Sequence, residues 1–185
     1  LNEYIGTGIH EMTICVSNVG YKTKGGHLTS PDTQTNWNGI TGRIELIGYK
    51  NAHAENVMLW CDINNKTVRV TAEITGGKSG KAVISAESFN SKKNHTPEIQ
   101  SFEYTNGKLD ALYKMGDDCL LWSEHEPNLY KLRIDIDGDV SEHIIGMREF
   151  RTEGGKFTIN GEKTFLRGKH DGMIFPKTAF APTDL

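Results

Sequence analysis

Strict alternation between apolar and polar residues constrains the fold of this chain more than any other feature. The alternation runs over Val68–Ile74 and again over Tyr130–Ile136. Because successive side chains of a β-strand point to opposite faces, a period of two is the pattern of a half-buried strand. No stretch repeats with the 3.6-residue period of an amphipathic helix. The chain is therefore predicted to consist of β-strands almost throughout.

Shorter apolar runs predict further strands, and turn residues separate them. Asn106-Gly107 and Asp137-Gly138 each lie between two runs, and both pairs tolerate the positive φ angles of a tight hairpin. About seven short strands with regular turns are typical of an antiparallel β-sandwich of the immunoglobulin type. We place this sandwich between Ile44 and Arg151. The runs are Ile44–Tyr49, Val57–Ile63, Ala82–Phe89, Ile99–Tyr104, Leu109–Met115 and Val140–Met147.

The two flanks depart from this pattern. The N-terminal flank holds one expected strand, Glu11–Val16, followed by a long polar stretch over residues 17–38 that would be unusual inside a compact domain. In the C-terminal flank, Phe157–Ile159 and Thr164–Leu166 predict a hairpin across Asn160-Gly161. The chain also begins with Leu rather than Met. We therefore expect a piece of a longer protein, with flanks that belong to neighbouring domains.

The composition excludes several classes of partner. With a net charge of -3 and no dominant cluster of Lys and Arg, a nucleic-acid partner is not expected. No stretch is apolar for long enough to span a membrane. Cys15, Cys61 and Cys119 lack the C-x-x-C spacing of zinc and redox sites, so we expect buried, reduced cysteines. Neither histidine spacing nor a phosphate-binding loop indicates a metal or cofactor, and none is expected.

Two acidic clusters are candidates for a catalytic or metal-binding site. Asp135, Asp137 and Asp139 lack the glycine and glutamate positions of an EF-hand loop, so outward-facing acids of a hairpin are expected. Glu124 and Glu126 could form the carboxylate pair of a glycosidase. Because they lie beside a proline and just before a strand, a solvated corner is the expected structure.

Four residues remain as candidate ligand contacts. Trp37 lies between two asparagines and could either stack on a sugar ring or plug a gap between two domains. Arg167, His170 and Asp171 follow the last expected strand. Together they could hold an anionic or hydroxyl-rich ligand, or they could form an ordinary charged loop.

Three separated stretches resemble glycoside hydrolase family 2, which includes β-galactosidases, β-glucuronidases and β-mannosidases. The first resembles the family's junction between an N-terminal sugar-binding jelly roll and an immunoglobulin-like domain. The second resembles the late part of that domain, and the third its exit into a (β/α)8 barrel. In order, the stretches are GITGRIEL (Gly39–Leu46), LLWSEHEPNLYKLRIDI (Leu120–Ile136), and GMREF with FTINGEKTFLRG (Gly146–Phe150 and Phe157–Gly168).

The resemblance implies three parts and an enzymatic parent. Residues 1–43 would end the jelly roll, 44–152 would form the immunoglobulin-like sandwich, and 153–185 would form a lead-in hairpin and the start of the barrel. The parent would be a retaining exo-β-glycosidase of the β-galactosidase type. In this family both catalytic glutamates lie on later barrel strands, downstream of position 185. No catalytic residue is therefore expected here, and the chain alone is expected to be inactive.

The resemblance also bears on the candidate ligand contacts. Arg167 matches the arginine that ends the first barrel strand in the family. The family commonly continues R-G-V-N-x-H, whereas this chain reads Arg167-Gly168-Lys169-His170-Asp171. Because of this difference, the resemblance does not predict which sugar is bound. His170 and Asp171 are expected to face the pocket, because barrel active sites lie at the C-terminal ends of the strands.

Further expectations concern partners and location. The expected partner is a carbohydrate substrate, which the full-length enzyme would bind. A periplasmic or secreted location would suit such an enzyme. A surface that normally meets the barrel would be exposed in this chain and would favour self-association. The alternative is a stand-alone immunoglobulin-like module that binds carbohydrate or protein, which the strand pattern supports equally well.

Overall fold

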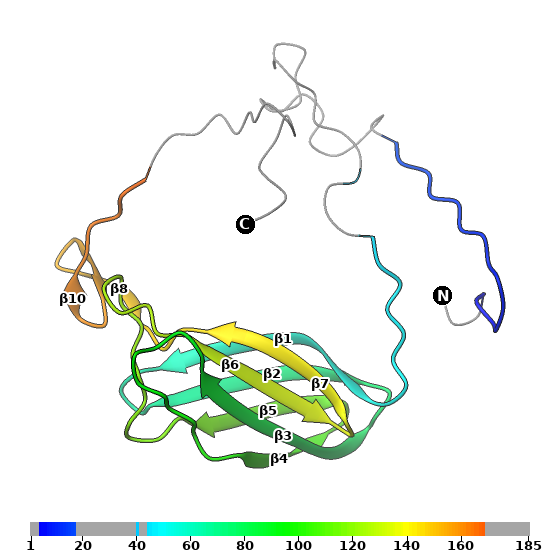
Figure 1. The fold of residues 1–185 in the computed structure, drawn as a ribbon, viewed down its shortest axis with the longest axis horizontal. Coiled ribbons are helices and arrows are strands. Elements are labelled where there is room, and N and C mark those ends of the chain that lie inside the picture. The colour runs from blue at the N-terminus through cyan, green and yellow to red at the C-terminus, as the bar shows by residue number, and fades with distance from the viewer. Residues whose placement is uncertain (1–3, 18–39, 41–43, 169–185) are drawn as a thin grey trace, which may run out of the picture. The chain divides into compact units, whose positions relative to one another are not determined.

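Tight turns and alternating strands organise the fold. The computed structural model describes residues 4–17, 40 and 44–168, which form ten β-strands and no helix, and hence no helix that could cross a membrane. The strands, all but β9 labelled in Figure 1, are β1 (His53–Asp62), β2 (Thr67–Thr75), β3 (Ser79–Ser88), β4 (Gln100–Thr105), β5 (Lys108–Lys114), β6 (Tyr130–Ile136), β7 (Asp139–Ile145), β8 (Phe150–Glu153), β9 (Lys156–Ile159) and β10 (Glu162–Lys163).

The hairpin turns predicted at Asn106-Gly107 and Asp137-Gly138 are confirmed. Asn106 and Gly107, between β4 and β5, have φ angles of 53° and 66°. Asp137 and Gly138, between β6 and β7, have φ angles of 51° and 86°. Positive φ at both central residues matches the right-handed twist of the flanking strands. The carboxylate of Asp135 accepts a 2.8 Å hydrogen bond from the Gly138 amide, so this acid stabilises a turn, as expected for outward-facing acids of a hairpin.

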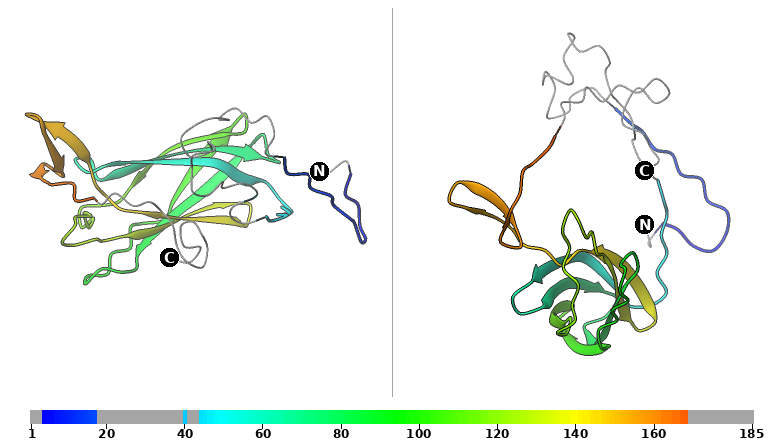
Figure 2. Two further views of the ribbon diagram at one scale, coloured as in Figure 1. Left: turned by 90° about the horizontal axis from the view of Figure 1, so that it is seen from above. Right: turned by 60° about the vertical axis from the view of Figure 1, so that its left-hand side comes forward.

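The predicted antiparallel sandwich of the immunoglobulin type is also confirmed. Seven strands are hydrogen-bonded in the order β1-β2-β5-β4-β3-β6-β7, and every pairing is antiparallel. β4 pairs with β3 over six residues, but with β5 only at Thr105 and Lys108 beside the turn. The series therefore divides into two layers, β1-β2-β5 and β4-β3-β6-β7, which wrap around one core (Figure 2).

The alternation in the sequence decides which side chains enter this core. Every second residue of β2 and β6 points inward, so Val70 and Leu132 are completely buried while Arg69 is exposed. Each fully buried Leu, Ile or Val contributes about 1.5–3 kcal/mol of hydrophobic stabilisation. The completely buried aliphatic side chains of the two layers are Val68, Val70, Ala82, Ile84, Leu132, Ile134 and Ile136.

A buried tyrosine ties the loop before β6 to the core. Tyr130 begins β6 and is completely buried. Its hydroxyl accepts a 2.8 Å hydrogen bond from the Leu120 amide and lies 2.8 Å from Nδ1 of His95. A tyrosine at the start of this strand, bonded to backbone upstream, is a feature of immunoglobulin-like sandwiches. Burial raises the pKa of Tyr130 above its ordinary value, so the hydroxyl stays protonated in the fold.

Two histidines make the stability of the sandwich depend on pH. Burial lowers the pKa of His95, against a weaker opposing effect of Asp118, and burial alone lowers the pKa of His143. Both are therefore favoured as neutral imidazoles in the fold, and below the ordinary histidine pKa of about 6.5 the unfolded chain binds more protons. The free energy of unfolding is expected to fall as the pH drops from 7.5 towards 5. Urea titrations at the two ends of this pH range will measure the loss of unfolding free energy in wild type and in His143→Gln. An equal loss in the two proteins would contradict the assignment to His143.

Four predictions fail in the flanks and at the hairpin. Glu11–Val16 and Ile44–Tyr49 are not strands, because they have no neighbouring strand to pair with among the described residues, and their apolar side chains are exposed. Cys15 lies in the first of these segments and is exposed rather than buried; Cys61 and Cys119 are partly buried free thiols. The last hairpin strand is only Glu162–Lys163, although the Thr164 amide still donates to the Phe157 carbonyl at 2.9 Å.

Candidate functional site

One end of the sandwich carries a hairpin and a loop that are joined by polar contacts. The hairpin sheet has the order β10-β9-β8, and the loop is Leu120–Leu129, which leads into β6. We call the contact region between them the junction. It is formed by Trp122 and Glu124 of the loop, Gly146–Arg151 of the connection from β7, and Asn160 of the turn between β9 and β10.

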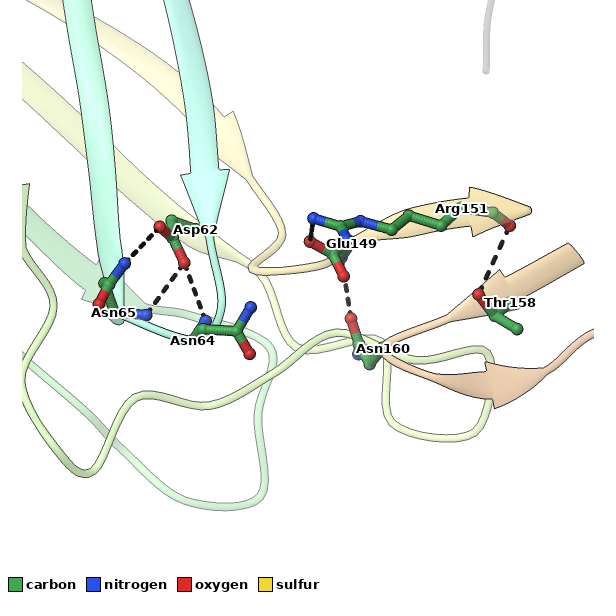
Figure 3. A network of polar contacts seen from close by, with 7 residues as sticks. All are labelled: Asp62, Asn64, Asn65, Glu149, Arg151, Thr158 and Asn160. Atoms are coloured by element: carbon green, nitrogen blue, oxygen red, sulfur yellow. Dashed lines mark hydrogen bonds and ion pairs between the residues drawn. The ribbon is translucent and has the colours of Figure 1, made fainter. Parts of the chain in front are cut away.

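Asn160 is the central residue of the junction (Figure 3). Its side-chain oxygen accepts a hydrogen bond from the Glu149 amide, and its own amide donates to the Glu149 carbonyl, both at 2.9 Å. Its side-chain nitrogen donates to the Trp122 carbonyl at 2.9 Å. Asn160 has a φ of 53°, a conformation that asparagine adopts more readily than most residues. One turn residue therefore holds the hairpin to both the connection and the loop.

Trp122 packs the loop against the connection. Its amide donates to the Met147 carbonyl at 2.9 Å, and its ring lies 4.5 Å from the guanidinium carbon of Arg148. A Cβ added to Gly146 would lie 3.0 Å from the Trp122 ring, so a larger residue would require the ring to shift by a few tenths of an ångström. The contact combines apolar packing with a cation–π interaction worth about 0.5–1 kcal/mol at an exposed site.

Charged residues surround the junction. Arg151 pairs with Glu149 at 2.6 Å (Figure 3), and Arg167 lies 3.7 Å from Glu124. The pKa of the Asp62 carboxyl, in the turn after β1, is lowered first by hydrogen bonds from Asn65 and Asn64 and to a lesser degree by the charge of Arg151. These pairs are solvent-exposed, so they orient the elements more than they stabilise the fold.

The predicted ligand contacts are only partly described. Trp37, His170 and Asp171 lie outside the described residues. Arg167 lies within them, and its side chain is 80% exposed at the Glu124 contact. Glu124 also lies 3.4 Å from His125, and Glu124 and Glu126 are both exposed, as expected for a solvated corner. The described part of the chain holds no cluster of His, Cys, Asp or Glu that could bind a metal ion.

The sequence did not reveal the role of Asn160 or Trp122. Asn160-Gly161 was recognised only as a turn, which is all that a two-residue signal can indicate. The bond from Asn160 to Trp122 joins residues 38 positions apart, and no local pattern encodes it. Trp122 does lie within Leu120–Ile136, one of the three stretches that resemble the family.

Asn160→Ala is expected to loosen the hairpin. The variant loses two side-chain hydrogen bonds, each worth about 0.5–1.5 kcal/mol, and leaves the Glu149 amide without its partner. Hydrogen exchange of the Glu149 and Thr164 amides should accelerate by roughly tenfold or more.

Asn106→Ala is the matched control, because Asn106 has the same φ of 53° and is also followed by glycine. Its side chain makes no hydrogen bond within the described residues, so this variant loses only the conformational preference. Each variant is measured in its own hairpin, β4–β5 for Asn106→Ala and β9–β10 for Asn160→Ala. If hydrogen exchange accelerates equally in both, the side-chain bonds of Asn160 contribute nothing.

The fold and the junction together define an immunoglobulin-like sandwich that leads into a docked hairpin, and the sequence comparisons identify its family. The sequence matches glycosyl hydrolases family 2 over residues 50–148, more than half of the chain. The chain therefore belongs to glycosyl hydrolases family 2.

Individual relatives agree with this assignment. A β-galactosidase of Thermoanaerobacterium thermosulfurigenes is 27% identical over 148 residues, which cover 75% of this chain and 19% of the relative. A β-galactosidase of Leuconostoc mesenteroides is 24% identical over 131 residues, covering 64% of this chain and 13% of the relative. The chain thus spans less than a fifth of the length of these curated relatives.

A solved structure supports the fold. The β-glucuronidase of Faecalibacterium prausnitzii aligns with a TM-score of 0.50 at 16% identity, over 63% of this chain and 18% of that one. At this level of identity the likeness concerns the fold alone. It agrees with the two-layered arrangement described above.

Proposed function

We propose that this chain is the central, non-catalytic segment of a retaining exo-β-glycosidase of the β-galactosidase type, which hydrolyses O-glycosidic bonds in carbohydrates. In this proposal the segment braces the catalytic barrel. The observation that carries it is the family match over residues 50–148, followed directly by a hairpin that is docked on the sandwich through Asn160. Relatives of this chain are glycoside hydrolases several times its length.

The junction supports a bracing role physically. A chain that leaves a domain through a flexible linker has no fixed direction. Here the connection is held by the hydrogen bonds of Asn160, by the packing of Trp122 on Gly146 and by the Arg167–Glu124 contact. A barrel that continued from Arg167 would therefore start from a defined position and direction.

The proposal keeps the division expected from the resemblance. Residues 1–43 would end the sugar-binding jelly roll, 44–152 would form the sandwich, and 153–185 would enter the barrel. Arg167, His170 and Asp171 would lie at the end of the first barrel strand and contact the sugar, with Trp37 as a further contact. The catalytic glutamates would come from the later barrel, so the chain alone would be inactive.

Exposed apolar residues of the hairpin region support the proposal that another domain covers this surface in the parent. Phe150, Phe165 and Leu166 are 50%, 66% and 65% exposed. Apolar side chains grouped on a surface mark sites that another domain or chain covers. Barrel residues would cover them in the parent, and self-association would cover them in the isolated chain.

The test is to sequence the gene beyond Leu185 and to assay both products. We expect about 250 further codons with alternating strands and helices, an Asn-Glu pair and a second, later Glu. The full-length protein should hydrolyse aryl β-galactosides or β-glucuronides with retention of configuration, and the 185-residue chain should not. A downstream sequence without a barrel, or hydrolysis by the short chain, would refute the proposal.

A further inference from the structure

The outer face of the layer β1-β2-β5 carries large apolar side chains in a regular arrangement. The strand register places Trp60, Arg69 and Leu112 in one row across the three strands, and Met58, Thr71 and Asp110 in the next row. Met58, Trp60 and Leu112 are 56%, 48% and 55% exposed. We call these two rows the outer face.

A β-bulge shapes the surface beside these rows. The register shifts between Glu55 and Met58, and Asn56 within the bulge has a φ of 50°. The side-chain nitrogen of Asn56 donates to the Glu73 carboxylate at 2.9 Å. Bulges re-aim side chains and are common next to functional sites. Next to the bulge lies an open hollow of about 330 Å³, lined by Asn56, Met58, Thr71, Ala72, Glu73, Lys108, Leu109 and Asp110.

A paired hydrogen-bond donor and acceptor lie at the centre of the outer face. Nε and Nη2 of Arg69 donate to the two carboxylate oxygens of Asp110 at 2.9 and 2.7 Å. The guanidinium carbon also lies 5.7 Å from the centre of the Trp60 ring. A guanidinium has five N–H donors and a carboxylate about four acceptor sites, so both groups keep free capacity. Both side chains are more than half exposed, so the pair is accessible to a ligand.

The chemistry of the outer face favours a carbohydrate over a protein partner. Sugars combine apolar C–H faces with hydroxyl groups that donate and accept. An aromatic ring beside fixed polar groups suits both features. The cores of protein–protein interfaces are depleted of charge, whereas here an ion pair occupies the centre.

The charge balance favours a neutral ligand. Glu55, Asp62, Glu73 and Asp110 contribute four negative charges to the outer face and its rim, against three positive charges from Arg69, Lys108 and Lys114. An acidic saccharide would meet this negative excess, and a neutral saccharide would not.

We propose that the outer face binds a neutral oligosaccharide, with Trp60 stacking on a sugar ring and with Arg69 and Asp110 bonding its hydroxyl groups. The outer face shares no residue with the junction or with the candidate contacts Trp37, Arg167, His170 and Asp171. It does not depend on the bracing role, because the residues of the outer face take no part in the junction.

The test is a binding titration of the 185-residue chain by isothermal calorimetry. The probes are cellohexaose, xylohexaose and β-1,4-galactohexaose, with hexagalacturonate as the acidic counterpart. We expect at least one neutral probe to bind with a Kd of roughly 1 mM or tighter. Trp60→Ala should weaken this binding about tenfold, and Arg69→Lys, which keeps the charge but loses the planar fork, should also weaken it.

Matched controls make the outcomes decisive. Ile144→Ala removes a 62% exposed side chain from β7 in the other layer and should leave binding unchanged. If circular dichroism shows that Trp60→Ala is unfolded, the titration uses Leu112→Ser in its place. No binding of any neutral probe up to about 10 mM, or equal affinity of wild type and Trp60→Ala, overturns the proposal. Tighter binding of hexagalacturonate overturns the ligand class, and self-association that Trp60→Ala abolishes would assign the outer face to a second copy instead.

Discussion

Leu132→Ala is expected to lower the free energy of unfolding by about 2–5 kcal/mol. Leu132 is completely buried in β6. Its strand lies between β3 and β7, so neighbours on both sides and the opposite layer surround the side chain. Removing it costs the transfer free energy of the lost methyl groups and leaves a cavity that the paired strands cannot close.

Leu112→Ala is the matched control for this prediction. It is the same substitution, also in the middle of a strand, but the Leu112 side chain is 55% exposed and points away from the core. Its expected cost is within about 0.5 kcal/mol, as for most surface substitutions. Urea unfolding monitored by circular dichroism gives both values. Similar losses in the two variants would mean that the inner and outer faces are assigned wrongly.

Tyr130→Phe is expected to cost about 1–3 kcal/mol, although it removes only one oxygen atom. That oxygen accepts the hydrogen bond of the Leu120 amide and contacts His95. In the variant a part-buried N–H donor loses its partner, and a backbone donor without a partner is among the least tolerated defects in a folded protein.

Tyr113→Phe tests whether the orphaned donor is the cause. Tyr113 is equally buried, and burial raises its pKa to about 12, but its hydroxyl donates to the carbonyl of Glu98, an exposed residue, at 3.0 Å. A carbonyl has two lone pairs and tolerates the loss of one donor better than an N–H tolerates the loss of its acceptor. Tyr113→Phe is therefore expected to cost less than Tyr130→Phe. The reverse order, measured by the same urea titration, would contradict this explanation.

The candidate site shows the limits of sequence interpretation more clearly than the fold. Of the four predicted ligand contacts, only Arg167 lies among the described residues, and its sugar contact stays a prediction. Asn160 was visible as half of an Asn-Gly turn, because turn chemistry is local. Its bond to Trp122 was not visible, since it depends on how the hairpin folds back onto a distant loop.

Features that depend on neighbouring residues could be predicted from the amino-acid sequence of this protein. Alternation revealed which residues of β2 and β6 face the core, Asn-Gly and Asp-Gly revealed two hairpin turns, and ordered motifs revealed the family. Each of these signals lies within a few neighbouring residues, where backbone geometry and side-chain direction are coupled.

Long-range pairing was settled only by the three-dimensional arrangement. Glu11–Val16 has an apolar pattern yet forms no strand, because a strand needs a hydrogen-bonding partner that its own residues cannot supply. The longer pairing of β4 with β3, the alignment of Arg69 with Leu112, and the bond from Asn160 to Trp122 all join residues that are well separated in the chain. Their energies depend on register and packing between strands, which no single stretch of sequence contains.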